Sequence, residues 1–472
     1  MHALNTIALL IRVTQNFMKQ LVFLLLVGFA SGRLSAQQNL GVRNSNYAGI
    51  QGALINPSSI ADSKMNWDLN IISVDEVFGN TFLYAPKKNL HFLGFKQIIK
   101  GALDQDLFGT HFDPQNPYKL YQVSFSGEAL GPSFFLKLPK NQAIGFSFRA
   151  RAYANFNNIT GALAQNLFDY FLNKSLWATD LHDNSVKIDE MSWLEYSVHY
   201  AAEAYSDAHD EIKAGVSLNY LMGNTGAYAK NANLNYKIND SNFIFTNTSL
   251  DYGRTDLNRP TNFGNGNGFG ADLGFTWLHF RQDRNKYLYR VGLSLIDLGA
   301  IKFKHNAAAY HLEADSADFS NWHQQHFVSN TQFDRAVSAV FYAGDSSKSL
   351  VANQFKMGLP SAISVQADWN VCQRYFLNLT VIKGFHHGNG QGVIRPDVYG
   401  LTPRYETPDL DVSLPFSLLY YGHMQSRLGI ACRYKYFFIG GDAPGPLLKL
   451  KDLDGADFYT GVRFYILPKN QK

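Results

Sequence analysis

Apolar and polar residues alternate strictly along several segments of this chain. In residues 142–157 apolar side chains occupy every second position, and polar or small side chains fill the positions between them. The same pattern recurs in residues 194–200, 212–220 and 458–466. Successive side chains of a β-strand point to opposite faces, so each segment predicts a strand with one apolar and one polar face.

About 14 such segments can be placed along the chain, which predicts an all-β fold. The predicted strands are 66–86, 119–139, 143–156, 192–205, 211–221, 231–238, 242–252, 268–281, 286–303, 361–371, 374–384, 409–422, 426–439 and 456–467. The short connections between them are 139–142, 206–210, 239–241, 282–285, 372–373 and 423–425. The long connections are 87–118, 157–191, 222–230, 253–267, 304–360, 385–408 and 440–455.

Short and long connections alternate along this series. Short periplasmic turns and long extracellular loops are typical of a transmembrane outer-membrane β-barrel with antiparallel strands. An even number of strands would leave both termini in the periplasm. A soluble β-sandwich or propeller also has alternating strands, but it does not need every second connection to be long.

Composition agrees with a membrane barrel better than with a soluble enzyme. The chain is 46% hydrophobic, 14% aromatic and only 17% charged, whereas soluble domains usually carry about 25% charged residues. No apolar stretch of 18 residues follows residue 36, so a helical membrane protein is not expected. Without residues 1–36 the chain has 39 basic and 38 acidic side chains. This near-neutral balance argues against nucleic-acid binding.

Residues 1–36 have the order of a secretory signal peptide, with a start that could also be Met18. Lys19 precedes an apolar run from residue 21 to residue 30, and residues 34–36 read Leu-Ser-Ala. An uncleaved anchor helix would need roughly 20 apolar residues. Because no cysteine follows the expected cut, a lipid-anchored N-terminus is not predicted.

The two cysteines are expected to be free thiols, since Cys372 is predicted in a turn and Cys432 inside a strand. We predict no cofactor and no metal site. The pair His386-His387 lies in a glycine-rich segment, where solvated histidines are the simpler interpretation.

The segment 44–61, NSNYAGIQGALINPSSIA, precedes the first predicted strand. It resembles the Asn-Pro-Ala element in the hatch of the long-chain fatty acid transporter (FadL-like) superfamily, with Ser58 in place of the usual alanine. Residues 268–275 and 289–299 look like strands of that superfamily. The resemblance implies a 14-stranded barrel over residues 66–467 with residues 37–65 folded into its lumen as a hatch, and a tail over residues 468–472.

A closer resemblance is to a Bacteroidota outer-membrane barrel family of unknown function. It rests on the Asn-Tyr-Ala-Gly and Asn-Pro motifs of the same opening segment, on residues 401–406 (LTPRYE) and on residues 438–442 (FIGGD). These motifs are short and mostly structural, so they imply fold and location more than function.

Strand parity predicts which charged residues point into the lumen. The predicted ligand-binding residues there are Arg149, Arg151, Glu195, His199 and Arg290. Six further residues are predicted to point inward: Glu203, Lys213, Asp272, Asp368, Arg433 and Arg463. Mixed charges of this kind most often form a structural network of ion pairs. Alternatively, Arg149 and Arg151 could hold the carboxylate of an amphipathic ligand.

Two further places could contribute to function. In the hatch, Asn56 and Pro57 suit a turn, and the hatch could either shift on ligand binding or remain a static plug. In the first two long loops, apolar residues recur at helical spacing and predict a hydrophobic groove or a packed cap. The predicted groove residues are Phe95, Ile98, Ile99, Phe168, Phe171 and Leu172.

An enzymatic function is not predicted. Ser197, His199 and Glu195 share one strand face, but the Cβ atoms of neighbours on such a face are roughly 7 Å apart, so a bond between a nucleophile and its base would depend on the reach of the side chains. No nucleophile elbow, phosphate-binding loop or zinc-binding helix motif is present.

The sequence therefore predicts an outer-membrane barrel that binds or takes up a small hydrophobic or amphipathic molecule. The alternatives are a protein-interaction barrel, resembling the shuttle and accessory barrels of the type IX secretion system and binding an exported protein, or a structural outer-membrane protein. Expected partners are outer-membrane lipid, lipopolysaccharide and the barrel-assembly machinery, which would recognise the last strand. Phe458, Tyr459, Phe464 and Tyr465 are predicted to form an aromatic girdle on that strand.

Overall fold

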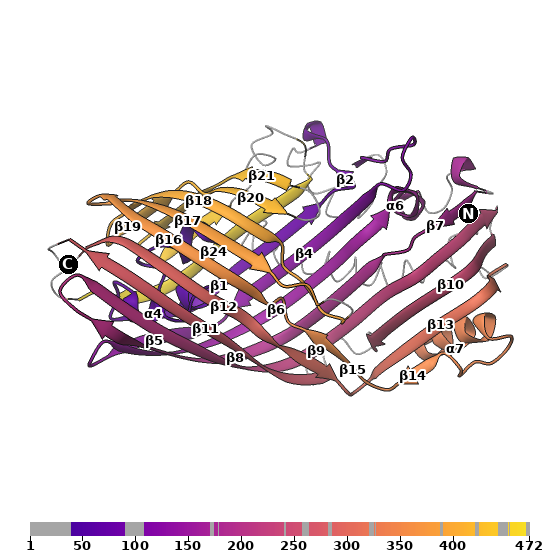
Figure 1. The fold of residues 1–472 in the computed structure, drawn as a ribbon, viewed down its shortest axis with the longest axis horizontal. Coiled ribbons are helices and arrows are strands. Elements are labelled where there is room, and N and C mark those ends of the chain that lie inside the picture. Colours follow the sequence, from indigo (N-terminus) through magenta and orange to yellow (C-terminus); the bar gives the residue numbers. More distant parts are fainter. Residues whose placement is uncertain are drawn as a thin grey trace.

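The computed structural model describes residues 39–89, 108–169, 174–177, 179–239, 242–256, 264–281, 286–320, 325, 327–387, 390–420, 424–441, 452 and 454–468. The predicted signal peptide and the last four residues of the predicted tail lie outside these ranges. Within them, the chain forms a closed barrel of antiparallel strands (Figure 1). No helix in the described ranges is long and apolar enough to cross a membrane.

Fourteen antiparallel strands make up the barrel wall. The first seven are β1 (Trp67–Asn80), β4 (Leu120–Leu130) continued by β5 (Ser133–Leu138), β6 (Gln142–Thr160), β8 (Lys187–Ser206), β9 (Asp210–Asn239), β11 (Gly266–Phe280) and β12 (Tyr287–Phe303). The other seven are β15 (Phe355–Gly358) continued by β16 (Ala362–Cys372), β17 (Tyr375–Gly384), β18 (Asp397–Glu406), β19 (Leu410–Ser413) continued by β20 (Phe416–Tyr420), β21 (Met424–Leu428) continued by β22 (Ile430–Tyr434), β23 (Phe437–Gly441) and β24 (Gly455–Ile466). The barrel closes because β1 pairs with both β24 and β4.

The strand number is as predicted, but the strands are not all the predicted ones. Residues 211–238 form one continuous strand, β9, instead of two strands separated by a loop. Strand β18 and strand β13 (Ala307–Asp318) lie in segments predicted to be loops. The predicted strand 426–439 contains a turn between β22 and β23. In each case the apolar alternation is weak, because polar residues or prolines interrupt it, while the hydrogen bonds to neighbouring strands continue.

Two predicted short turns also lie at the wrong end of the barrel. The connections after β9 and after β20 are at the end with the long loops, not at the end with the short turns. The short turns at residues 407–409 and 435–436 were not predicted, because they interrupt segments that looked like continuous loop or strand.

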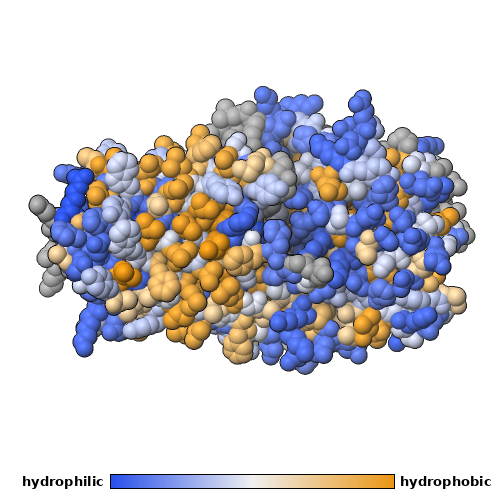
Figure 2. All heavy atoms as spheres, in the orientation of Figure 1, coloured by the Kyte–Doolittle hydropathy of each residue, from blue (hydrophilic) through white to orange (hydrophobic). Residues whose placement is uncertain are grey.

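The outer surface of the wall carries a belt of exposed apolar side chains over one half of the barrel (Figure 2). Its members include Val198, Leu218, Phe269, Phe275 and Leu428. Strand β9 has 30 residues, which is roughly 100 Å at about 3.3 Å per residue. This length far exceeds the apolar band of about 25 Å on a membrane barrel. The wall therefore continues beyond the belt, into the half of the molecule that Figure 2 shows as hydrophilic.

We call this continuation the outer extension. It consists of the last part of β9 with β10 (Asn242–Thr255), β13 and β14 (Leu350–Ala352), and helix α7 (Asn330–Phe341) packs against β13 through an apolar cluster that includes Leu312, Val337 and Phe341. The remaining elements at this end are β2 (Leu83–Tyr84), η1 (Lys87–Asn89), β3 (Gly109–Thr110), α6 (Gly161–Phe168), η2 (Lys174–Leu176) and β7 (Asp180–His182).

The lumen at the short-turn end is filled by residues 39–65, the described part of the predicted hatch. Three short helices, α2 (Leu40–Arg43), α3 (Ile50–Ala53) and α4 (Ser59–Asp62), are almost wholly buried there (Figure 1). Helix α4 contacts β6, β8 and β9, and α2 contacts β18 and β22, so the hatch reaches opposite sides of the wall.

The aromatic girdle predicted on the last strand is only partly correct. Phe464 is exposed on the outer face of β24, but Tyr459 is fully buried and Tyr465 donates a hydrogen bond to the carbonyl of Pro408 at 2.8 Å. Both tyrosines have the inward parity of β24. The cysteines are free, as predicted, although Cys372 is the last residue of β16 and does not lie in the turn.

Candidate functional site

Asn56 and Pro57 of the hatch lie against three glycines of the wall. A methyl group added to Gly274 would overlap Asn56 Oδ1, and one added to Gly215 would overlap Pro57 and Ser58. Gly292 faces the Asn56 amide in the same way. Glycines on β9, β11 and β12 therefore form a seat that allows the backbone of the Asn-Pro turn to approach the wall closely.

The amide of Asn56 completes this seat with hydrogen bonds. Its Nδ2 donates to the carbonyl of Phe275 at 3.2 Å and to Gln366 Oε1 at 3.2 Å, and its Oδ1 accepts from the Ser58 hydroxyl at 2.7 Å. The Ser58 hydroxyl also lies 2.7 Å from Thr276 Oγ1. Asn56 thus stabilises its own turn and also binds strands β11 and β16 of the wall.

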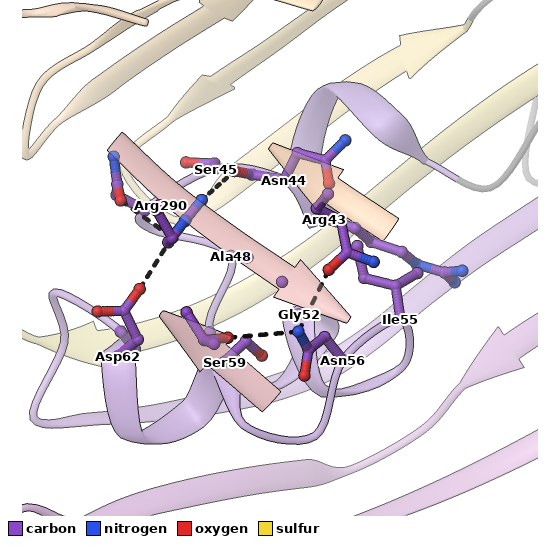
Figure 3. A pocket seen from close by; sticks show the side chains of 16 residues that line it. Arg43, Asn44, Ser45, Ala48, Gly52, Ile55, Asn56, Ser59, Asp62 and Arg290 are labelled. Carbon is purple, nitrogen blue, oxygen red and sulfur yellow. Dashed lines mark hydrogen bonds and ion pairs between the residues drawn. The ribbon is translucent and has the colours of Figure 1, made fainter. Parts of the chain in front are cut away.

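Charged side chains tie the rest of the hatch to the wall. Arg290 on β12 reaches Asp62 at 3.0 Å, Asp368 at 3.1 Å and the carbonyl of Asn44 at 3.1 Å. Figure 3 shows Arg290 between Asp62 and Asn44, beside a small cavity of about 40 Å³ within the hatch. Arg463 on β24 donates to the carbonyls of the hatch at Ala48 and Tyr47. The predicted lumen residue Arg290 therefore contacts the hatch directly.

A layer of buried charged residues joins the hatch, through Arg43, to the wall. Arg151 on β6 forms a bidentate pair with Asp297 on β12, at 2.6 and 2.9 Å, and a further ion pair with Glu195 on β8 at 3.0 Å. Arg149 pairs with Glu195 and lies 3.5 Å from Glu128. We call the following residues the charged layer: Arg43, Asp75, Glu128, Arg149, Arg151, Glu195, Asp272, Asp297 and Arg395.

Asp297 is the centre of this layer. It has a φ of 57°, which only glycine and a few short polar residues adopt readily, and it lies at a shift in register between β11 and β12. This bulge turns the carboxylate of Asp297 inward, where it accepts from both Arg151 and Arg395. Strained backbone of this kind persists only where the surroundings fix it, and it is concentrated at functional sites.

His199 is buried and has only neutral hydrogen-bond partners. Its Nε2 lies 2.9 Å from Ser147 Oγ and its Nδ1 lies 2.7 Å from Ser217 Oγ. The hydroxyl of Ser197 donates to Glu195 at 3.2 Å and not to His199. The structure therefore does not join Ser197, His199 and Glu195 into a nucleophile–base arrangement.

The other predicted inward residues are buried too, with one difference. Lys213, Asp272, Asp368, Arg433 and Arg463 are almost wholly buried. Glu203 is half-buried near the short-turn end, where it accepts from Asn141 Nδ2 at 2.8 Å. Parity along the strands is thus a sound guide to the lumen, except near the rim.

Apolar side chains fill the lumen on the loop side of the charged layer. Trp193 is next to Arg151, whose guanidinium lies 4.8 Å from the Trp193 ring centroid, and Tyr153 stacks on Trp193 at 5.6 Å. We call the following thirteen buried residues the lumenal apolar cluster: Tyr153, Met191, Trp193, Leu221, Tyr228, Ile301, Phe303, Ala307, Ala309, Phe355, Met357, Leu359 and Val393. Barrel lumens are usually polar, so a cluster of this size is a distinctive feature.

Residues 390–396, which we call the inner loop, extend into the lumen and complete the cluster. Val393 is fully buried, and the backbone amide of Ile394 donates to Asn155 Oδ1 at 2.8 Å. The amide of Gly392 donates to Asp189 Oδ1 at 3.0 Å. Arg395 forms an ion pair with Asp297 and donates from Nε to the carbonyl of Pro360 at 2.8 Å. The inner loop is thus a second plug, at the other end of the lumen from the hatch.

The predicted loop groove is only partly visible. Phe168 is buried in a cluster with Phe82, Tyr121 and Ile159, and its ring lies 6.5 Å from that of Phe82 in an edge-on arrangement. This is the packing of a cap. Phe95, Ile98, Ile99, Phe171 and Leu172 lie outside the described residues.

Several central residues were not predicted as site residues. Asp297 lies where the alternation breaks, and Arg395 lies in a segment that was predicted to be a loop. Trp193 and Val393 are apolar, whereas only charged residues were considered as ligand-binding residues of the lumen. One signal was available: Asp297 interrupts the apolar run Leu293 to Leu298, and a charged residue at such a position needs a buried partner.

Solved barrels with a similar arrangement of the chain share little sequence with it. The TodX monoaromatic hydrocarbon channel deltaS2 mutant has a TM-score of 0.45 at 9% identity, with 89% of this chain and 95% of that chain covered. The toluene transporter TodX of P. putida has a TM-score of 0.39 at 8% identity, with 89% and 94% covered. A Pseudomonas aeruginosa FadL homologue has a TM-score of 0.30 at 8% identity, with 92% and 98% covered.

Sequence comparison gives a family. No curated protein sequence matches the chain significantly. The family described as "Family of unknown function (DUF5723)" matches residues 106–442. This match covers well over half of the chain, including the inner loop and every residue of the charged layer except Arg43 and Asp75, and the chain therefore belongs to the DUF5723 family.

Proposed function

We propose that this barrel binds a small hydrophobic molecule in its lumen and passes it across the outer membrane. The observation that carries the proposal is the lumenal apolar cluster. Aromatic, methionine and leucine side chains pack together inside a barrel, where polar side chains are the rule. We propose that this region is the ligand compartment. A pocket of largely apolar lining with a few polar groups at one end is the usual form of a small-molecule site.

The inner loop occupies this compartment in the closed state. Val393 belongs to the cluster, and the side chain of Arg395 holds the loop through Asp297 and Pro360. Backbone hydrogen bonds of the loop to Asn155, Asp189 and Gly358 complete its contacts with the wall. The hatch has many more contacts with the wall. We propose that the ligand displaces the inner loop first and that the hatch is the second barrier, between the charged layer and the periplasm.

The proposal includes an orientation in the membrane. The apolar belt would lie in the outer membrane among lipid and lipopolysaccharide, with the short turns and both termini in the periplasm and the outer extension outside the cell. Strand β24 would be the element that the barrel-assembly machinery recognises. Short periplasmic turns and longer outer loops are the usual arrangement of such barrels.

A disulfide that fixes the inner loop tests the proposal. Asn155 and Ile394 are neighbours through a hydrogen bond of 2.8 Å, so we would introduce N155C and I394C in a C372S, C432S background. Native mass spectrometry of the barrel released from nanodiscs would measure bound 1-dodecanol. We expect binding in the reduced protein and its loss in the oxidised protein, because the fixed loop cannot leave the compartment.

Each single-cysteine variant is the matched control and should bind under both conditions. Equal binding by oxidised and reduced protein would place the ligand elsewhere and would contradict the proposal. Absence of binding in both forms and in the parent barrel would contradict the uptake function itself.

A second candidate function is binding of an exported protein, as in the shuttle and accessory barrels considered above. The outer extension favours it, because β9, β10, β13 and α7 form a folded layer well beyond the apolar belt. Removal of residues 325–349, which include α7, would separate the two functions, since it should abolish protein binding and leave 1-dodecanol binding intact.

A further inference from the structure

We infer that the ligand of the lumenal compartment is an uncharged molecule, with an apolar body and a neutral oxygen acceptor such as a hydroxyl or a carbonyl group. This inference rests on the proposed function and names the ligand class of that site. It follows from the charges that form the floor of the compartment.

Every arginine of the charged layer already has a carboxylate partner. Arg43 pairs with Asp75 at 3.0 Å and Glu128 at 3.2 Å, Arg149 with Glu195, Arg151 with Asp297, and Arg395 with Asp297. The described residues of the layer thus comprise four arginines and five carboxylates, Asp75, Glu128, Glu195, Asp272 and Asp297. No positive charge is in excess.

An anionic ligand would therefore have to take an arginine from its partner. Asp297 would be left buried with fewer donors, and breaking a buried ion pair by removing one member is strongly unfavourable. The carboxylate of a fatty acid is such a ligand. The interpretation of Arg149 and Arg151 as a carboxylate clamp is consequently disfavoured by the same ion pairs that place them side by side.

The groups that could bind a cationic ligand already have partners within the protein. The faces of Trp193 and Tyr153, which would attract a cation, lie 4.8 and 5.3 Å from the guanidinium of Arg151. Asp272, the carboxylate without an arginine, accepts from Asn219 Nδ2 at 3.0 Å and from the backbone amide of Asp297 at 2.6 Å.

For a neutral ligand oxygen, in contrast, two hydrogen-bond donors remain without an acceptor. The Nε groups of Arg149 and Arg151 are buried and have no hydrogen-bond acceptor among the described residues. A buried N–H without an acceptor is costly, and an uncharged oxygen can satisfy it without disturbing the carboxylates. Arg151 also borders the apolar cluster through Trp193. A ligand body among the apolar residues would then have its oxygen at the arginines.

Three probes with the same chain and different head groups test the inference: 1-dodecanol, dodecanoate and dodecylammonium. Their affinities for the full barrel in nanodiscs would be compared by native mass spectrometry. We expect 1-dodecanol to bind at least about tenfold more tightly than either charged probe, because only the charged probes disturb the ion pairs.

Two isosteric variants each remove one carboxylate charge. D297N removes the carboxylate partner of Arg395 and leaves Arg151 with Glu128 and Glu195, so we expect the preference for the alcohol over dodecanoate to fall by about tenfold or more. D272N leaves every arginine paired, so its preference should remain that of the parent. Both variants would first be shown to retain the folded barrel.

The outcomes separate the two claims. If no probe binds the parent barrel, the proposed function fails. If dodecanoate or dodecylammonium binds the parent as well as the alcohol does, or if D272N and D297N change the preference equally, the function stands and the inference about ligand class is overturned.

Discussion

Gly274 shows that the close packing of the hatch against the wall depends on single glycine residues. It lies under Asn56, and the next strands contribute Gly215 and Gly292 to the same seat. An asparagine–proline turn has a rigid backbone at the proline, so it cannot move away from an added methyl group without moving the hatch. The Asn-Pro element can be recognised in the sequence. Its glycine partners cannot, because they lie more than 150 residues further along the chain.

Substitution G274A should therefore loosen the hatch. The added methyl group would overlap Asn56 Oδ1, and overpacking of this kind costs about 1–3 kcal/mol. We expect a free energy of unfolding lower by that amount in urea titration, together with a higher conductance in planar bilayers.

Gly127 offers a matched control on the same barrel. A methyl group there would lie 3.2 Å from the end of the Phe125 ring, on the outer face of the wall. G127A should cost less stability than G274A and should leave the conductance unchanged, because its added methyl group contacts no residue of the hatch. If the two substitutions changed stability and conductance equally, the contact between Gly274 and the hatch would not be the cause of the effects of G274A.

At the scale of elements, β10 and β13 form part of a sheet that lies beyond the apolar belt. The pair is held partly by charges on one face. His311 Nδ1 lies 2.7 Å from Asp251 Oδ1, His311 Nε2 lies 3.5 Å from Glu313, and Lys230 on β9 lies 3.8 Å from Asp251. The hydrogen bond to Asp251 raises the pKa of His311 above its ordinary value of 6.5.

The strand pair should consequently be more stable in mild acid. A histidine whose pKa is raised in the folded state stabilises that state fully below the unfolded pKa, and this stabilisation is lost as the pH rises through the folded pKa. Histidine NMR should give a pKa above 6.5 for His311, and D251N should lower it.

E313Q provides the comparison, since Glu313 is the more distant partner. It should lower the pKa of His311 less than D251N does. A pKa unchanged by D251N would contradict the assignment of Asp251 as the main cause.

The inner loop and the hatch are elements of a different kind, because each lies inside the lumen and is anchored to the wall by side-chain contacts. A chain of ion pairs runs between them, from Arg43 in the hatch through Glu128 and Arg151 to Asp297 and Arg395. Both plugs therefore depend on the same wall residues, and Asp297 is the residue that joins the inner loop to this chain.

At the scale of the whole molecule, the barrel is much longer than its apolar belt. Figure 2 shows the belt over one half and polar side chains over the other. Such an arrangement fixes how far the barrel enters the membrane, since charged and polar groups on the lipid-facing surface are costly. The outer extension would then project from the cell with α7 at its side.

Cysteine labelling checks this orientation. Val328 is 92% exposed beside α7, and Lys140 is exposed in a short turn. With a membrane-impermeant maleimide in a C372S, C432S background, we expect V328C to react on intact cells and K140C only after the outer membrane is permeabilised. The reverse pattern would invert the proposed topology.

The sequence by itself determined the strands and their faces. Alternation at a period of two is local, so it placed Arg149, Arg151, Glu195, His199 and Arg290 on the inward side. It also predicted the correct number of wall strands. It failed where alternation fades, as in residues 222–230 of β9 and in β13, because these segments have no regular apolar face to signal a strand.

Only the tertiary structure decided how the lumen is filled. Which carboxylate meets Arg151, why Asp297 adopts a positive φ, and how Val393 enters the apolar cluster all depend on contacts between strands far apart in the chain. The physical reason is that the two-residue period of a strand fixes the face to which each side chain points. The residue that it then contacts depends on how the strands pair when the barrel closes. Periodicity therefore predicted the lumen residues, and closure made them a charged layer beneath an apolar compartment.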